Sequence, residues 1–508
     1  MNAPLERSSP ADAERHQLAW AAWPADLVTP VRAYLSLRAA RRTACLLESV
    51  EGPARLARYS FLGVDAVEHF RGRGNTSTLR GPHGSRTIEG PVHAALRACL
   101  PRALPPPPAH LPPFVGGFVG WFAFEWCTAL EPRVPRAALD PWDVPDATFE
   151  RFDHVVGFDH AAQKVFVVAR CERGAADHAD AMERIDALAH DALGPREVQS
   201  GPFRLARELA AGAELAAVTE PERYREGVLA LKRAIAAGEV FQAVLAQRFE
   251  ERFSGDPFTL YRVLRLVNPS PHMFHFTADG LTIAGSSPER LVSVQGRRVE
   301  NRPIAGTRPR GATPEDDERL ARELQADAKE RAEHDMLVDL ARNDLGRIAR
   351  VNTVRVDEHA VLERFARVQH LVSRVECELA PGRDALDALA ASFPAGTVSG
   401  APKVRALELL AGLERDTRGP YAGCFGYLDF RGNLDMALVL RSFVARGDVL
   451  SLQTGAGVVF DSDPETERQE TLHKARALFE AARVASSDAF RAARPDPLAA
   501  LKGGRGCS

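Results

Sequence analysis

The chain has 508 residues, enough for one large domain or two to three closely packed lobes that enclose a water-excluding site. Its 65 basic and 68 acidic residues nearly cancel, so no excess charge is available to bind nucleic acid or an anionic membrane. The seven cysteines include no C-x-x-C pair, and no apolar run reaches membrane-spanning length. We therefore expect a cytoplasmic protein with reduced thiols.

The first part of the chain is predicted to be rich in strands. A flexible leader is expected over residues 1–15, followed by a first lobe over residues 16–200. The proline run of residues 101–113 interrupts regular structure within this lobe. The segments VVGFDH and KVFVVARC that follow are predicted to form a hairpin that turns at residues 160–163.

The second part, residues 201–490, begins with a predicted helix. Thr219 and Glu222 have the spacing of a capping box, the helix ends at Gly238, and VFQAVLAQRF follows as a strand. A tail that contains proline and glycine covers residues 491–508. We expect an α+β fold of mainly antiparallel sheets sandwiched between outer helices.

Four glutamates form two pairs with E-x-x-E spacing, Glu330/Glu333 and Glu467/Glu470. Residues three apart lie on one face of a helix, so two facing helices would bring four carboxylates together. Mg²⁺ prefers oxygen ligands and commonly bridges carboxylates to an anionic substrate. The pairs therefore predict a magnesium site, although each pair alone is more typical of a solvated helix surface.

A second group of residues suits the binding of a dicarboxylate. Arginine binds a carboxylate through two hydrogen bonds, lysine supplies a point charge, and glycines let backbone N–H groups approach an oxyanion. Taken singly, such a lysine is more typical of a surface salt bridge and the glycines of a tight turn. The members of this group are Arg441, Gly455, Ala456, Gly457 and Lys474.

A third group offers proton transfer and orientation: Glu289, His370, Thr397 and Tyr421. A histidine or a desolvated glutamate transfers protons near neutral pH. A single histidine beside apolar residues is more often structural, so the order of the surrounding motifs has to decide.

The motifs that contain these residues occur together and in order. Segment by segment they resemble the chorismate-binding enzyme family, which includes the large subunits of anthranilate synthase and aminodeoxychorismate synthase, isochorismate synthases and salicylate synthases. The resemblance is specific over about residues 220–485 and looser over residues 28–170. The motifs are SSPERLV, NRPIAGTRPRG, KERAEHDMLVDLARNDLGR, QHLVSRV, FPAGTVSGAPKVRALELL, YAGCFGYLDF and TGAGVVFDSDPETERQET.

Two positions discriminate among the members of this family. Water-using members have a lysine base where this chain has Gln242, and a glutamine cannot deprotonate water. Many aminodeoxychorismate synthases resemble P-I-K-G-T and use that lysine as a nucleophile, but Ala305 stands there in this chain. Both positions favour a member that uses ammonia in the manner of anthranilate synthase.

A further segment resembles the tryptophan-binding site of feedback-inhibited anthranilate synthases. It implies a regulatory role for the first lobe and L-tryptophan as an inhibitor. The family more often has tyrosine at the position of His272, a departure that bears on tryptophan binding. The residues implied in this site are Leu47, Glu48, Ser49, Pro271 and Met273.

The resemblance also implies roles for the remaining residues. Glu333 and Glu470 would hold Mg²⁺ with Glu330 and Glu467 nearby. The expected ligands of chorismate are Tyr421, Arg441, Gly455, Ala456, Gly457, Lys474, Gln242 and Thr307.

The same resemblance implies an order of chemical steps. Glu289 would protonate the departing C4 hydroxyl while ammonia adds at C2 to give aminodeoxyisochorismate. His370 would assist aromatisation after pyruvate leaves, with Thr397 orienting the ring and Glu330 close to the reacting centre.

Ammonia is expected to come from a separate glutaminase subunit, because Cys424 lacks the histidine that follows a glutaminase nucleophile. Two alternatives remain open. One is an aminodeoxychorismate synthase large subunit, and the other is a non-catalytic sensor of chorismate or tryptophan.

Overall fold

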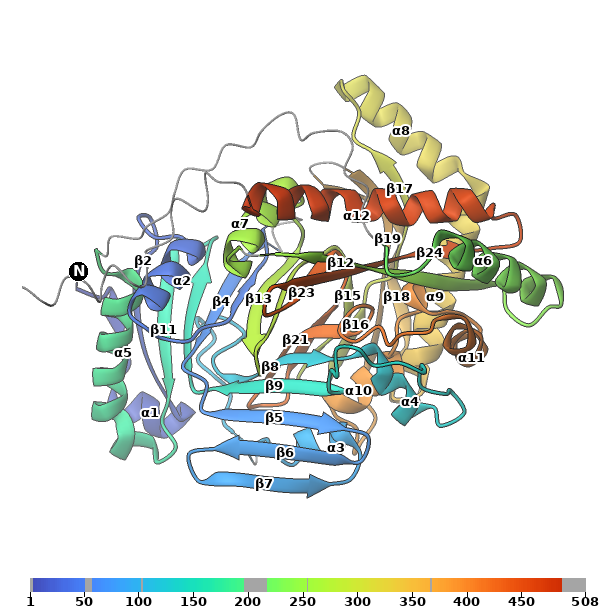
Figure 1. Cartoon of the computed structure of the whole chain (residues 1–508). Helices are drawn as coiled ribbons and strands as arrows, with labels where there is room; N and C mark the ends of the chain where they lie inside the picture. Colours follow the sequence, from blue (N-terminus) through green and yellow to red (C-terminus); the bar gives the residue numbers. More distant parts are fainter. Residues whose placement is uncertain are drawn as a thin grey trace, which may run out of the picture.

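The computed structural model describes residues 3–50, 57–101, 104–195, 217–253, 255–365 and 368–486. Two large antiparallel sheets lie inside, and the helices lie on their outer faces (Figure 1). The α+β class and the antiparallel arrangement predicted from the sequence are confirmed. The predicted tail and the boundary near residue 200 fall outside the described residues.

The first sheet contains strands from both parts of the chain. Its order is β1 (Glu6–Arg7), β2 (Leu18–Pro24), β11 (Lys164–Arg170), β10 (His154–Asp159), β4 (Tyr59–Val64), β3 (Leu46–Glu48), β13 (His272–Ala278), β14 (Leu281–Ser287), β23 (Ser442–Arg446), β24 (Val449–Val458), β12 (Gln242–Arg252) and β20 (Gly400–Ala401).

The second sheet is shared in the same way. Its order is β17 (Ile304–Pro309), β19 (Val368–Glu378), β16 (Arg298–Asn301), β15 (Arg290–Gln295), β22 (Leu434–Leu438), β21 (Cys424–Asp429), β8 (Gly117–Phe122), β9 (Ala147–Phe152), β5 (Glu68–Arg73), β6 (Thr76–Gly81) and β7 (Gly84–Glu89), with β18 (Arg355–Arg364) paired to β19. The two lobes predicted from the sequence therefore interlock strand by strand.

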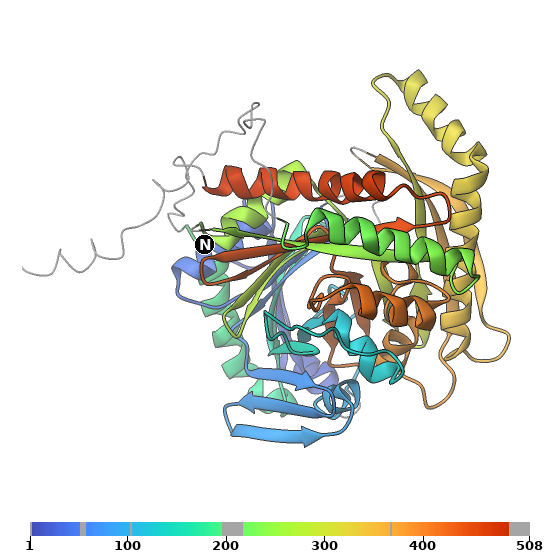
Figure 2. The same ribbon diagram turned by 45° about the vertical axis from the view of Figure 1, so that its right-hand side comes forward.

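Helices cover the outer faces of both sheets. Figure 2 shows α12 lying across the first sheet beside α6, while α8 and α9 stand at the far end of the molecule. No helix in the described ranges has the length and apolar character needed to cross a membrane. The helices are α1 (Pro10–His16), α2 (Pro30–Ala39), α3 (Val92–Arg97), α4 (Cys127–Leu130), α5 (His178–Leu193), α6 (Pro221–Ala236), α7 (Pro257–Val267), α8 (Pro314–Ala326), α9 (Ala328–Gly346), α10 (Ala385–Ser392), α11 (Lys403–Leu413) and α12 (Pro464–Ser486).

An aromatic core holds the two sheets together. Phe274 of the first sheet stacks on Phe425 of the second with ring centroids 4.5 Å apart, and Trp121 packs edge-on against Phe276. All four side chains are buried. Such offset and edge-to-face pairs add to the free energy gained by burying their area.

Several local predictions can be compared with the structure. The hairpin is confirmed, since Asp159 of β10 pairs with Lys164 of β11. Helix α6 and strand β12 lie where they were expected. The capping box is wrong: Glu220 is the N-cap of α6 and makes no side-chain capping bond, while Pro221 at the start fixes the backbone.

The predicted leader over residues 1–15 contains a helix. Ser9 caps α1 through a capping box with Asp12, and Ala13 is fully buried against the first sheet. From residue 3 on, the leader is therefore corrected to an ordered segment, because the cap and this burial offset the cost of ordering a polar stretch.

The chain crosses between the sheets several times, and a predicted site residue lies at two of these crossings. Glu289 lies between β14 and β15, and Arg441 lies between β22 and β23. The Leu438 N–H donates to the Glu289 carbonyl at 3.0 Å, and the Ser286 N–H donates to the Arg441 carbonyl at 3.2 Å. The two crossings are thus tied to each other where the sheets meet.

Candidate active site

The acidic pairs predicted to hold a metal come from α9 and α12. Burial raises the pKa of Glu333, and the charges of Glu330 and Glu470 raise it further, so helices distant in sequence are close in space. Burial and the nearby Glu470 likewise raise the pKa of Glu467. Mutual repulsion of this kind is expected where several carboxylates face one position.

Basic side chains neutralise part of this cluster. Glu330 forms an ion pair with Arg308 at 3.0 Å, and Glu470 forms one with Lys474 at 2.7 Å. Within the described residues, no group of three or more His, Cys, Asp or Glu side chains is close enough to hold a metal ion. The convergence of four carboxylates on one metal position therefore stays a prediction, and the structure shows only that Glu330 and Glu470 lie near enough to Glu333 to raise its pKa. The all-oxygen donor set and its repulsion still suit Mg²⁺.

Gln242 lies beside this carboxylate cluster. Its Nε2 is 3.4 Å from Glu333 Oε1, and a Cβ atom placed on Gly457 would lie only 2.6 Å from the same nitrogen. Val244, two residues further along β12, pairs with Gly457 in β24. The glycine thus leaves room for the amide to reach Glu333.

Changing Gly457 to alanine tests this packing. The new methyl group would displace the Gln242 amide from Glu333, and we expect kcat/KM for chorismate to fall roughly tenfold. Gly412→Ala on α11 is the control, because its Cβ would meet nothing within 4 Å. Equal kcat/KM values for the two variants would show that the position of the Gln242 amide does not affect the reaction of chorismate.

Gly455 lies among the residues that were predicted to bind a dicarboxylate. Lys474 Nζ donates to the Gly455 carbonyl at 2.9 Å, and a Cβ on Gly455 would lie 3.2 Å from the Tyr421 hydroxyl oxygen. Tyr421 is buried, which raises its pKa to about 12 and keeps it a neutral donor. Residues 455–457 lie within strand β24, with Ala456 fully buried.

His370 and Arg441 form the other side of the candidate site. His370 Nδ1 lies 3.1 Å from the Gly306 carbonyl and 3.0 Å from Thr307 Oγ1. A carbonyl only accepts, so Nδ1 carries the hydrogen and Nε2 keeps its lone pair. Burial and the nearby Arg441 hold the His370 pKa below its usual value, so the imidazole is a neutral base near pH 7.

Arg441 has an unusual backbone. Its φ of 46° is left-handed, which a residue other than glycine adopts only where the surrounding structure requires it. This conformation lets the chain pass from the second sheet to the first at that residue. Strand β22 stops at Leu438 and β23 begins at Ser442, so Arg441 lies in the connection between them.

Glu289 has the properties of a buried acid. Thr397 Oγ1 donates to Glu289 Oε1 at 2.8 Å, and burial raises the pKa of this carboxyl to about 7. Thr397 lies in a single 3₁₀ turn, η3 (Gly396–Val398), which contacts β12, β24 and α9. Both residues line a small cavity between α9 and β15.

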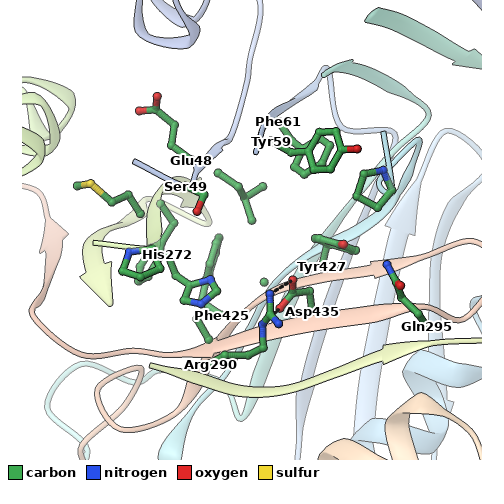
Figure 3. Close-up of a pocket in the computed structure, with 17 residues that line it drawn as sticks. Glu48, Ser49, Tyr59, Phe61, His272, Arg290, Gln295, Phe425, Tyr427 and Asp435 are labelled. Atoms are coloured by element: carbon green, nitrogen blue, oxygen red, sulfur yellow. Dashed lines mark hydrogen bonds and ion pairs between the residues drawn. The ribbon is translucent and has the colours of Figure 1, made fainter. Parts of the chain in front are cut away.

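The five predicted tryptophan-site residues line one cavity of about 210 Å³ between the sheets. Two of these residues, Met273 of β13 and Glu48 of β3, pair across neighbouring strands of the first sheet. Aromatic and charged side chains complete its wall (Figure 3). The lining includes Leu47, Glu48, Ser49, Pro271, Met273, Tyr59, Phe61, His272, Arg290, Phe425, Tyr427 and Asp435.

Glu48 and Ser49 contribute differently to this cavity. The Glu48 carboxylate accepts from Tyr261 at 2.5 Å and from Arg265 at 3.0 Å, and neither partner lines the cavity. Ser49 Oγ is buried without a hydrogen-bond partner in the described ranges, so it can bond a ligand. Burial and two arginines lower the His272 pKa, so its ring is neutral.

Arg418 was missed from the sequence. It is 2% exposed, and its guanidinium donates to the carbonyls of Val244 in β12 and Val398 in η3, at 2.6 and 2.7 Å, and to Glu414. These bonds brace the strand and the turn that carry Gln242 and Thr397. The signal that could have identified Arg418 was its position three residues before Tyr421. An arginine in a loop is usually exposed, however, so this position did not indicate a buried role.

Comparison with known proteins bears directly on this arrangement. The sequence pattern of chorismate binding enzymes matches residues 43–480. The chain belongs to the chorismate-binding enzyme family. Among curated relatives, anthranilate synthase component 1 of Synechocystis sp. is 43% identical, over 91% of this chain and 95% of its own length. The Thermus thermophilus protein of that name is 44% identical, with 91% and 97% covered.

Solved structures agree with the family assignment. The crystal structure of anthranilate synthase component I from Streptococcus pneumoniae superposes with a TM-score of 0.73 at 32% identity, covering 83% of this chain and 92% of that one. The menaquinone-specific isochorismate synthase from Escherichia coli has a TM-score of 0.66 at 20% identity, covering 92% and 95%, and shares the fold. The resemblance read from the sequence motifs is confirmed.

Proposed function

We propose that this chain is the large subunit of an anthranilate synthase, which converts chorismate and ammonia to anthranilate and pyruvate. The observation that carries the proposal is the Glu289–Thr397 pair, which provides a carboxylic acid still protonated near pH 7. A buried acid of this kind suits protonation of a departing hydroxyl. Gln242 stands where a water-activating lysine would be needed for isochorismate formation.

The roles of the residues follow from their chemistry. Arg441, Lys474 and the Tyr421 hydroxyl would hold the carboxylates of chorismate, and Glu289 would give its proton to the C4 oxygen as ammonia adds at C2. His370 would then accept the C2 proton through Nε2 when the enolpyruvyl group leaves as pyruvate. This step makes the ring aromatic.

Mg²⁺ is proposed as the cofactor. Glu333 and Glu470 would hold it, with Glu330 and Glu467 nearby, and it would neutralise a substrate carboxylate beside the acidic cluster. The residues of the chain would supply proton transfer and orientation.

A direct assay tests the proposed reaction. The purified chain is mixed with chorismate, Mg²⁺ and ammonium at alkaline pH, and anthranilate is followed by its fluorescence. Anthranilate plus an equal amount of pyruvate is expected. Accumulation of 4-amino-4-deoxychorismate without pyruvate would indicate an aminodeoxychorismate synthase, and chorismate binding without turnover would indicate a sensor.

The ammonia donor is proposed to be a separate glutaminase subunit. The relatives are named component 1, a name that implies a second component. Cys424 is buried in strand β21, and burial raises its thiol pKa to about 12, so it is not a nucleophile. Glutamine alone should therefore support no activity of this chain.

L-Tryptophan is proposed to bind the cavity between the sheets as a feedback inhibitor. The cavity combines aromatic walls with the Ser49 hydroxyl, which has no partner among the described residues, and the Arg290–Asp435 ion pair at 3.0 Å. Ser49→Phe would place a bulky ring in this space. We expect it to raise the inhibition constant for tryptophan at least roughly tenfold, as measured by anthranilate fluorescence. Unchanged inhibition would move the inhibitor site elsewhere.

A further inference from the structure

A buried glutamate in the first part of the chain forms hydrogen bonds with the loop that carries Tyr421. Glu125 lies in a short 3₁₀ turn, η1 (Phe124–Trp126), directly after β8. Its two carboxylate oxygens accept separate backbone bonds, from the Arg418 N–H at 2.6 Å and the Gly419 N–H at 2.9 Å. The Phe124 N–H donates to the Gly419 carbonyl at 2.8 Å. Three hydrogen bonds thus join η1 to this loop.

The geometry of this contact suits a carboxylate; burial raises the pKa of Glu125 to about 7, so the charged form that both donors need prevails above that pH. Two consecutive N–H groups point at one position, an arrangement that binds an anion, and Gly419 has the left-handed φ of 61° that helps to form it. A glutamine in place of Glu125 would aim its NH₂ group at one of the two donors. The carboxylate is 5% exposed, so water does not substitute for a lost bond.

The loop that Glu125 binds carries parts of the candidate active site. Tyr421 follows Gly419 by two residues, and its hydroxyl lies over Gly455. The Arg418 side chain packs 4.3 Å above the Phe124 ring and donates to the Val398 carbonyl, next to Thr397. Movement of residues 418 and 419 would act most directly on Tyr421, because Tyr421 lies two residues further along the same loop.

We infer that Glu125 is a positioning residue for substrate binding, acting through the backbone of residues 418–419 on Tyr421. The inference rests on the proposed function, because it takes Tyr421 as a ligand of chorismate. Loss of the hydrogen bonds from Glu125 would make Tyr421, which binds the substrate in its ground state, more mobile. Glu289 and His370 would remain in place. The effect should therefore fall mainly on KM.

Glu125→Gln tests the inference through separate measurements of KM and kcat. At saturating ammonium and Mg²⁺, KM for chorismate is expected to rise about tenfold, since a hydrogen bond to a charged group is lost, while kcat changes less than about twofold. Glu125→Asp, which keeps the charge but cannot reach both N–H groups, should behave alike. Glu150→Gln is the control, a half-buried glutamate of β9 whose partner is His69 at 3.1 Å.

The outcomes separate this inference from the proposed function. Wild-type chain that makes no anthranilate contradicts the proposed function. Wild-type chain that is active, with an unchanged KM in both Glu125 variants, overturns the positioning role. Equal KM increases in the Glu125 and Glu150 variants overturn it as well, because they would reflect general loosening of the core. If Glu125→Gln does not fold, the Asp variant alone decides.

Discussion

Replacing Glu289 with glutamine is expected to lower kcat by about 10²–10⁴-fold, with little change in chorismate binding. Glutamine has nearly the same shape and still accepts a hydrogen bond from Thr397, but it cannot give a proton to the leaving hydroxyl. Anthranilate fluorescence measures kcat, and isothermal titration measures chorismate binding. Retention of more than roughly a tenth of the wild-type kcat would remove Glu289 from the role of general acid.

The pH dependence of kcat tests independently whether Glu289 donates this proton. The acid must be protonated to act, and burial places its pKa at about 7, so kcat at constant free ammonia should hold below pH 7 and decline above it. The Thr397 hydrogen bond lowers this pKa. In Thr397→Val the decline should therefore begin at higher pH. A profile that does not move in this variant would contradict the pairing.

A second large loss of activity is expected when the metal ion is removed. Chelation with EDTA should abolish anthranilate formation by the wild-type chain, and excess Mg²⁺ should restore it. Glu333→Gln should lower activity by more than roughly a hundredfold at moderate Mg²⁺ and raise the Mg²⁺ concentration needed for half-maximal rate. The reason is that Glu333, repelled by Glu330 and Glu470, gains most from a cation.

Glu465→Gln is the matched control for this experiment. Glu465 lies on α12, in the same first turn as Glu467, but it bonds Arg225 and Arg468 at 2.8 Å on another side of the helix. Its loss should leave the Mg²⁺ requirement unchanged. If full activity persists in EDTA, or if the two variants respond alike to Mg²⁺, the acidic cluster has a role other than metal binding.

Local sequence patterns predicted the regular elements well where one interaction dominates. The run VFQAVLAQRF marks β12, whose residues 243–249 are buried on both faces of the sheet, and the stripe of Tyr224, Val228 and Leu231 marks α6 because one face packs on the sheet. The cap of α6 was misplaced because Pro221 sets the start of the helix without a side-chain bond. Helix α1 was missed because its capping box, Ser9 and Asp12, lies in a short polar stretch, and because the burial of Ala13 is a contact that no local pattern contains.

The sequence by itself determined the family, the order of its motifs and the residue types of the site, since carboxylates at i and i+3 share a helix face whatever surrounds them. Only the tertiary structure decided what each group can do. It turned the Glu48 carboxylate toward Tyr261, gave Glu289 a pKa of about 7, and brought Glu125 to a loop 293 residues away. Proton affinity and hydrogen-bond partners depend on burial and on neighbours distant in sequence, and folding alone creates both.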